Sequence, residues 1–401
     1  MRGLKPVSAV IIILFVASFA AAADRGRAVR PVHSGILVGP ESRITASPDS
    51  PWLESVAVAV GPSSGIVLWT QQSSILFARI AADGHPLDNG GRQLVKTANS
   101  QQHVAIDAFR NYFVAAWCEA VGSKLQIVAI LLDGDGRTLS AQPFVVADSV
   151  TTPQPVVDVT CMDAGCLIAW GGNSSNDGVY IASVNAQFVS ATTAPRTSAV
   201  LLAPKGIGIG VGTDNVSFAT AYAEQATYGQ SGAFVAKSIS PAGASSEVDL
   251  MSSSEQQIGS TWMAWDGSQW FILMLDLGTT GGLVQEFRFM RVDAVGRPIG
   301  NAVPALLDSV GVPPLCPWSP DVFLYDPQNR RAVWDGRNFL ALTQHAIVRV
   351  SPDGAIGDRV ANDEYFPRGY ALSVSTARNG RTIVAYSRDS AVAIRAIDDI
   401  P

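Results

Sequence analysis

Short runs of alternating apolar and polar residues recur along this chain at a regular pitch. Each unit begins with an alternating strand and a turn, and continues into a more apolar second strand that usually ends in an aromatic residue. The second strands end at positions 69, 117, 170, 222, 275, 343 and 386, so successive units lie about 53 residues apart. Small and β-branched residues dominate, and amphipathic helical stretches are almost absent. The pattern predicts an all-β repeat protein.

A third and a fourth strand complete most units. Residues 77–80 and 347–350 form third strands that run into turns containing Asp-Gly, where glycine reaches positive φ without steric cost. Fourth strands follow, for example at 93–95 and 143–146. Four antiparallel strands repeated around an axis form the blade of a β-propeller. Seven units therefore predict a seven-bladed β-propeller with four strands in each blade.

The two ends of the repeat region complement each other. The last unit stops after the strand at 391–396 and lacks a fourth strand, whereas residues 34–39 precede the first unit with a fourth-strand pattern. Pairing the two would close the ring and remove two exposed sheet edges. We therefore expect the N-terminal strand to close the last blade. The alternative, an open solenoid, predicts no pairing between residues near 36 and residues near 393.

Residues 1–23 have the features of a signal peptide. Arg2 and Lys5 precede an apolar run that starts at Val10, and the small residues at 21–23 fit a cleavage site before Asp24. The alternative is an uncleaved anchor, but the apolar run is short for a membrane span. We expect a flexible segment over 24–32, a propeller over 33–401 with an insertion at 309–330 between blades five and six, and a secreted or periplasmic location without a membrane span.

The four cysteines would then lie in an oxidising compartment. Cys161 and Cys166 flank a four-residue turn, which places them opposite each other across a hairpin and predicts a disulfide. The alternative is a pair of buried free thiols. A bridge between Cys118 and Cys316 is a second candidate, because both residues belong to loops expected on one face, although their blades lie far apart around the ring.

Two hairpins resemble those of a known group of proteins. Residues 265–270 (WDGSQW) and 334–339 (WDGRNF) resemble the WDG-x-x-aromatic hairpin of secreted bacterial repeat propellers. Residues 78–88 resemble a second segment of that group, in which Ala-Arg precedes Asp-Gly and Leu-Asp. The resemblance implies the propeller fold and export. The motif differs from the WD repeat, in which the Trp-Asp pair closes the third strand.

Motifs that carry chemistry elsewhere have structural explanations in this chain. The G-x-S-x-G string at 61–65 joins two strands without a following helix, and the glycines at 206–212 fit a closely packed inner strand. Asp133-Gly134-Asp135-Gly136 fits a tight turn better than a calcium loop. The histidines lack metal-ligand spacing, and the net charge of −6 disfavours nucleic acid. We expect no metal and no cofactor.

The loops that follow the second strands and enter the first strands should share one face of the ring. Propellers commonly bind ligands where such loops converge on the channel mouth. The candidate ligand-binding residues on this face are Trp52, Glu119, Glu224, Asp276, Arg331, His345, Arg368 and Arg388. The alternative is that they are solvated loop tips.

The sequence is most consistent with a monomeric, non-catalytic binding or scaffold module for a protein, a glycan or an envelope component. One alternative is a hydrolase or lyase that uses carboxylates from different blades, such as Glu119 and Glu224, on a glycan. Another is a purely structural ring.

Overall fold

The computed structural model describes most of the propeller region. The described residues are 35–44, 53, 55–71, 73–97, 99–140, 142–150, 155–175, 178–180, 182–190, 199–224, 233–239, 245–252, 258–276, 284–300, 304–311, 330–343, 345–361, 370–377, 380–388 and 391–399. The predicted signal peptide and flexible segment lie outside these residues, as do Trp52, Cys316, Arg368 and most of the insertion at 309–330. No helix in this part of the chain is long and apolar enough to cross a membrane.

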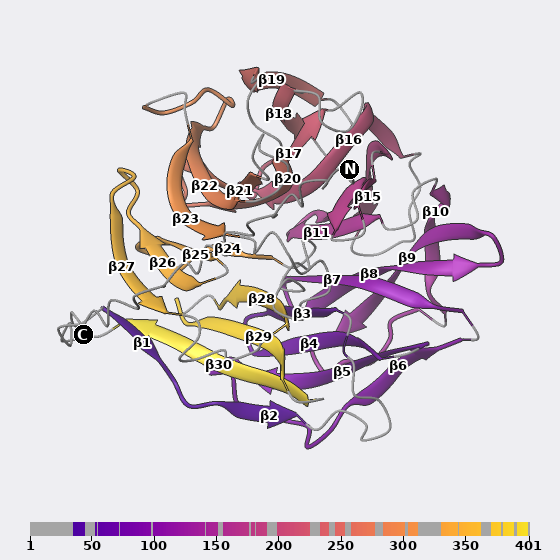
Figure 1. Cartoon of the computed structure of the whole chain (residues 1–401). Helices are drawn as coiled ribbons and strands as arrows, with labels where there is room; N and C mark the ends of the chain where they lie inside the picture. The colour runs from indigo at the N-terminus through magenta and orange to yellow at the C-terminus, as the bar shows by residue number, and fades with distance from the viewer. Residues whose placement is uncertain are drawn as a thin grey trace, which may run out of the picture. The chain divides into compact units, whose positions relative to one another are not determined.

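Seven four-stranded antiparallel blades follow one another in a ring, as predicted (Figure 1). Blade one contains β3 (Val56–Val60), β4 (Ser64–Gln71), β5 (Ser74–Ala81) and β6 (Arg92–Lys96). Blade two contains β7 (Gln101–Phe109), β8 (Tyr112–Val121), β9 (Lys124–Asp133) and β10 (Phe144–Val150). Blade five contains β20 (Ile258–Trp265), β21 (Gln269–Asp276), β22 (Val284–Asp293) and β23 (Ala305–Gly311). Blade six contains β24 (Ala332–Trp334), β25 (Phe339–Leu342), β26 (Ala346–Val350) and β27 (Ile356–Ala361).

Blades three and four are joined by one continuous strand. Blade three contains β11 (Val156–Met162), β12 (Gly165–Gly171), β15 (Ala182–Ser190) and the first half of β16 (Val200–Thr213). The second half of β16 is the innermost strand of blade four, followed by β17 (Phe218–Glu224), β18 (Ala233–Ile239) and β19 (Ser245–Ser252). A short hairpin of β13 (Asn173–Ser175) and β14 (Gly178–Tyr180) follows β12.

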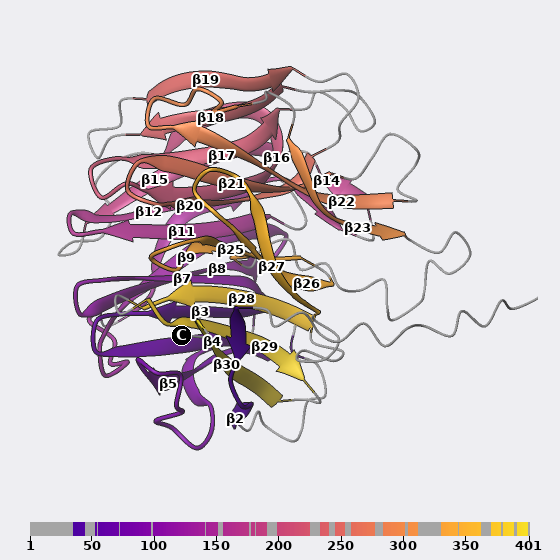
Figure 2. The same ribbon diagram turned by 90° about the vertical axis from the view of Figure 1, so that its left-hand side faces the viewer.

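The N-terminal strands close the ring in blade seven, as predicted. This blade contains β28 (Tyr370–Thr376), β29 (Thr382–Arg388) and β30 (Ala391–Asp399). Both β1 (Ile36–Val38) and β2 (Ser42–Ile44) pair with β30, and Figure 2 shows β2 beside it. Ile36 lies opposite Asp399 and Ser42 lies opposite Ile394. The pairing rules out the open solenoid.

Hydrophobic clusters fill all seven interfaces between neighbouring blades. Trp69 belongs to the cluster between blades seven and one, and Trp117 to the cluster between blades one and two; both side chains are fully buried. The Phe271 and Phe339 rings stack 4.8 Å apart between blades five and six. Because each sheet packs on both sides, most strands are apolar throughout rather than apolar on one face.

Polar side chains bind the backbone of the next blade at the inner strand edges. In blade seven, Ser373 and Ser375 accept hydrogen bonds from the amides of Val58 (3.2 Å) and Val60 (3.1 Å) in blade one. In blade one, Ser55 accepts from the amide of Val104 in blade two at 3.3 Å. A buried amide without a hydrogen-bond partner is costly. These side chains supply that partner at inner strand edges, which the neighbouring blades shield from water.

The repeated motifs form turns. Oδ1 of Asp266 accepts hydrogen bonds from the amides of Ser268 and Gln269, and Gly267 has a φ of 103°. In the same way, Oδ1 of Asp133 accepts from the amides of Asp135 and Arg137. The Asp-Gly pairs are therefore turn residues, as expected.

The glycine-rich strand and the first cysteine pair also match the sequence predictions. A Cβ on Gly210 of β16 would lie 2.5 Å from the carbonyl oxygen of Thr261 in β20, so glycine permits this close approach. Cys161 and Cys166 face each other across β11 and β12 and form a disulfide. Cys118, in contrast, is a free thiol buried between blades two and three, and burial raises its pKa to about 12. Cys316, the other member of the second candidate bridge, lies outside the described residues.

Candidate functional site

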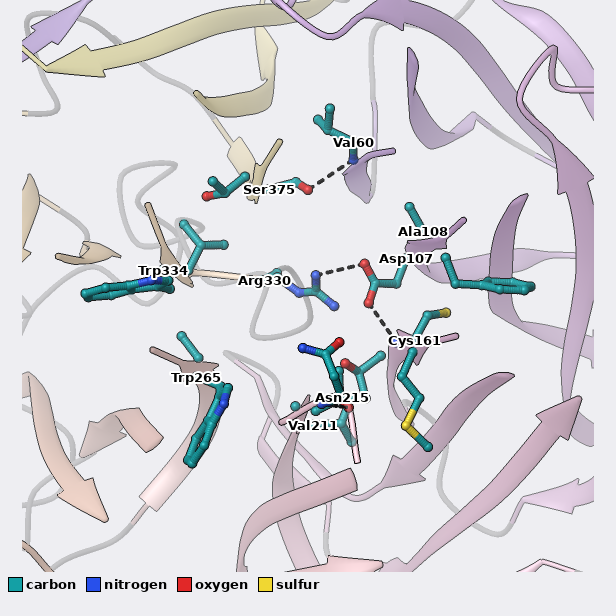
Figure 3. A pocket seen from close by; sticks show the side chains of 18 of the residues that line it. Val60, Asp107, Ala108, Cys161, Val211, Asn215, Trp265, Arg330, Trp334 and Ser375 are labelled. Atoms are coloured by element: carbon teal, nitrogen blue, oxygen red, sulfur yellow. Dashed lines mark hydrogen bonds and ion pairs between the residues drawn. The ribbon is translucent and has the colours of Figure 1, made fainter. Parts of the chain in front are cut away.

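All seven blades line one cavity of about 340 Å³ at an end of the central channel (Figure 3). This is the end where each innermost strand turns into the second strand. The innermost strands contribute one terminal residue per blade, namely Val60, Phe109, Met162, Thr213, Trp265, Trp334 and Thr376. The hairpin turns are short, so these strand ends converge around the axis. We refer to this space as the channel cavity.

Arg330 spans the channel and forms the floor of this cavity. It lies just before β24 in blade six, and its side chain reaches blades two and three across the ring. Nη1 donates to Oδ1 of Asp107 at 3.1 Å and Nη2 donates to the carbonyl oxygen of Val159 at 2.7 Å. The carbonyl oxygen of Arg330 accepts from the amide of Val374 in blade seven at 2.9 Å. Figure 3 shows the guanidinium near the centre of the ring, facing Asp107.

Two carboxylates on neighbouring innermost strands accompany Arg330. Oδ2 of Asp107 accepts from the amide of Cys161 at 2.9 Å, and Oδ2 of Asp158 accepts from the amide of Val211 at 3.1 Å. Both side chains therefore bind the backbone of the next blade, as the serines of blades one and seven do. Their charges also act on Arg330: burial would lower the pKa of its guanidinium, but the two carboxylates raise it.

Asp158 is the more perturbed carboxylate. Burial raises its pKa to about 6, and the neighbouring charge of Asp107 acts in the same direction. The positive charge of Arg330 and the amides of Val159 and Val211 oppose this shift without cancelling it. One guanidinium thus serves two acidic groups, of which Asp107 lines the channel cavity and Asp158 is buried outside its lining.

Two tryptophans form an aromatic wall of the channel cavity. Trp265 and Trp334 are the first residues of the two WDG hairpins in blades five and six, and both are partly exposed. Each is supported from behind by an aromatic residue of the second strand: Trp270 lies 4.7 Å from Trp265, and Phe339 lies 4.9 Å from Trp334. The motif therefore places one indole per blade at the cavity, while its Asp and Gly form the turn.

The residues predicted from sequence lie elsewhere, and none of the described ones lines the channel cavity. Glu119 is buried and accepts from Thr97 and Asn99. Asp276 lies 3.5 Å from Arg288, and the amide of His345 donates to Asp308. Arg388 pairs with Glu41, Arg331 lies over the Trp262 ring, and Glu224 ends β17 opposite Gly206 and Ala233. Several of these contacts lie within a single blade. A ligand site on the face that carries the loops after the second strands stays a prediction.

Sequence reasoning missed Asp107, Asp158, Arg330, Trp265 and Trp334 as site residues. Two features of the sequence could have identified some of these residues. An ionisable residue inside an otherwise apolar strand, such as Asp158 in VVDVT, needs a partner when buried. The repeated WDG tryptophans end the innermost strands and therefore face the channel end. For Arg330 the sequence held no signal, because its partners lie more than 150 residues away.

Comparison with known proteins supports the β-propeller fold but shows no family for this chain. No protein-family model and no curated protein sequence matches the chain. An α-L-arabinofuranosidase of Fusarium graminearum bound to an iminosugar inhibitor is 9% identical, with a TM-score of 0.52 over 90% of this chain and 98% of that chain. Its complex with arabinobiose is 8% identical, with a TM-score of 0.50 over the same shares. The WD40 domain of Toxoplasma gondii coronin is 11% identical, with a TM-score of 0.50 over 91% and 86%. At such identities the likeness shows a β-propeller and nothing about activity.

Proposed function

We propose that this protein is an exported, monomeric, non-catalytic binding module whose ligand enters the channel cavity. The observation that carries the proposal is that all seven blades converge on this one cavity. Its polar residues hold neighbouring blades together, and its partly exposed tryptophans offer apolar faces to a ligand. Such a combination of apolar walls and a few fixed polar groups is typical of small-ligand sites.

Two observations support export and the non-catalytic assignment. The Cys161–Cys166 disulfide is typical of proteins in an oxidising compartment, which favours a secreted or periplasmic location. Asp107 and Asp158 already accept hydrogen bonds from backbone amides. These bonds favour a role in joining blades. We include membership of the secreted WDG-repeat group in the same proposal. The tryptophans of that motif line the cavity, so the motif and the proposed site coincide.

A thermal-shift panel tests the proposal. We expect the full chain to be stabilised by one member of a panel of neutral oligosaccharides, acidic oligosaccharides, peptidoglycan fragments and peptides. A ligand present at 100 times its dissociation constant adds about 2.7 kcal/mol. Trp265→Ala should weaken binding and reduce the shift, whereas Leu139→Ala, which changes an exposed apolar residue of blade two outside the cavity, should retain it. A shift that survives Trp265→Ala but is lost in Glu119→Gln would place the ligand on the opposite face.

A carboxylate-dependent glycan hydrolase is the second candidate. The observation that favours it is the pair Asp107 and Asp158 beside Arg330, in which the pKa of Asp158 is raised to about 6, a value suited to a general acid. The pair would replace Glu119 and Glu224 as acid and base. Turnover of a neutral glycan that is lost in Asp158→Asn, with a melting temperature no lower than that of the unmodified protein, would establish this function and overturn the non-catalytic proposal.

A further inference from the structure

The channel cavity continues into a second, larger cavity on blades six and seven. This space of about 1140 Å³ shares Asn215, Trp334 and Thr376 with the channel cavity. It extends past Asp335 of blade six to Asp398 of blade seven. We call it the side groove. From this continuity we infer that the two spaces form one elongated site for a linear, neutral glycan; the inference rests on the proposed binding function.

The geometry favours a chain that enters end first. The channel cavity, at about 340 Å³, lies near the lower limit of about 300–1,000 Å³ for ligand pockets, so it accommodates one end of a chain. Arg330 spans the axis below it, held by Asp107 and by the carbonyl oxygen of Val159, and prevents a chain from passing through. The remaining units must leave along the open side groove. Trp334 lines both spaces and lies where the chain would turn from one to the other.

The charges along this path favour a neutral ligand. Arg381 pairs with Asp398 through two contacts of 2.7 and 2.9 Å, and Arg349 lies 3.4 Å from Asp335. Neutralised pairs present N–H donors and carboxylate acceptors at fixed positions. Sugar hydroxyls both donate and accept, so they match such pairs without adding net charge. Arg110 and Arg337 also line this path, so the two cavities together are lined by five arginines and four aspartates. A polyanion would therefore meet almost no net positive charge there and a chain with a net charge of −6.

The inner strand edges disfavour a peptide. Extended peptides commonly bind by adding a strand to an open sheet edge. At the channel, amides along several inner edges already donate to side chains of the preceding blade, as Val60 does to Ser375 and Cys161 does to Asp107. Recognition must therefore rely on side chains. The partly exposed indoles of Trp265 and Trp334 suit the C–H faces of sugar rings, because an indole combines a large apolar face with a polar edge.

Calorimetric titration with an oligosaccharide length series tests the inference. The probes are disaccharides and hexasaccharides of β-1,4-glucose, β-1,4-xylose and α-1,5-arabinose, with the full chain as receptor. In at least one series we expect the hexasaccharide to bind tenfold or more tightly than the disaccharide. Trp334→Ala should remove this length dependence, and Trp265→Ala should weaken both lengths equally. Leu139→Ala should bind as the unmodified protein does. Trp334→Phe replaces Trp334→Ala if the latter lowers the melting temperature.

The outcomes separate this inference from the proposed function. Equal affinity for disaccharide and hexasaccharide in every series, with binding that still depends on Trp265, would overturn the elongated site and keep the binding module. Tighter binding of oligogalacturonate or of a peptide than of any neutral glycan would overturn the ligand class; dependence on Trp265 would again keep the module. The absence of binding by every neutral probe would also overturn the inference. Binding that no longer depends on Trp265 would overturn the proposed function itself.

Discussion

Two arginine–carboxylate clusters lie in different regions of the propeller and have opposite electrostatics. Glu41, between β1 and β2, accepts hydrogen bonds from Tyr386, Arg388 and Arg43. Burial alone would raise the pKa of Glu41, but these bonds outweigh it and lower the pKa to about 2. In the channel, Arg330 serves both Asp107 and Asp158, and burial raises the pKa of Asp158 to about 6. Cations are in excess around Glu41, whereas carboxylates outnumber cations in the cluster of Arg330, Asp107 and Asp158.

The difference shows what each cluster contributes. The Glu41 cluster joins the N-terminal segment to blade seven, so it stabilises closure of the ring. The Arg330 cluster joins blades six, two and three across the axis at the proposed site. The extra negative charge of the Arg330 cluster lowers the free energy of unfolding. The Glu41 cluster carries no such cost.

Removing the cation from the channel should have the largest effect. Arg330→Met leaves the buried Asp158 and the partly buried Asp107 without their positive partner, and we expect a loss of about 3–5 kcal/mol in the free energy of unfolding, measured by urea denaturation. Arg137→Met, which removes an exposed arginine beside Asp135, is the matched control and should leave stability unchanged. A loss below about 1 kcal/mol for Arg330→Met would mean that the channel cluster does not hold the ring.

The closure cluster should show the next largest effect. Because the pKa of Glu41 falls from 4.5 to about 2 on folding, its ionised form stabilises the fold. This contribution is complete above about pH 4.5 and is lost as the pH falls towards 2. Glu41→Gln should lower the free energy of unfolding by up to about 3 kcal/mol at pH 7. When both proteins are measured at pH 2, the urea midpoint of the variant should approach that of the unmodified protein. Glu286→Gln serves as the control, because Glu286 also pairs with an arginine, Arg288, but is more exposed than Glu41.

Asp158 should give the opposite pH dependence. Its pKa rises from 3.8 to about 6 on folding, so ionisation in the folded state is unfavourable. The cost is absent below about pH 4 and complete above about pH 6, which gives a decrease of about 1–3 kcal/mol in stability as the pH rises across this range. We expect Asp158→Asn to remove this slope in urea denaturation between pH 4 and 8. An unchanged slope in the variant would assign the titration to another group.

A neutral contact at an inner edge should have the smallest effect. Ser375→Ala removes the acceptor for the buried amide of Val60 and should cost about 1 kcal/mol at every pH. Hydrogen exchange at Val60 should accelerate, while exchange at Val58, which donates to Ser373, should change little. A pH-dependent loss would contradict the neutral role.

Local patterns account for the parts of the structure that could be predicted. Alternation with a period of two gives strands, and Asp-Gly pairs give turns such as that at Asp266. A four-residue turn places Cys161 opposite Cys166, and the missing fourth strand of the last unit matches the spare strand before the first. Each of these features depends on residues close in sequence or on the repeat itself. The sequence alone therefore determined the seven blades, their closure and the disulfide.

Only the tertiary structure decided where the cavity lies. The sequence placed the candidate site on the longer loops, yet the described cavity lies at the short hairpins, because seven strand ends converge there. The contact of Arg330 with Asp107 joins residues from blades on opposite sides of the ring, and no local pattern encodes it. Ring closure fixes which side chains meet across the axis, because each blade brings only a few residues to the channel.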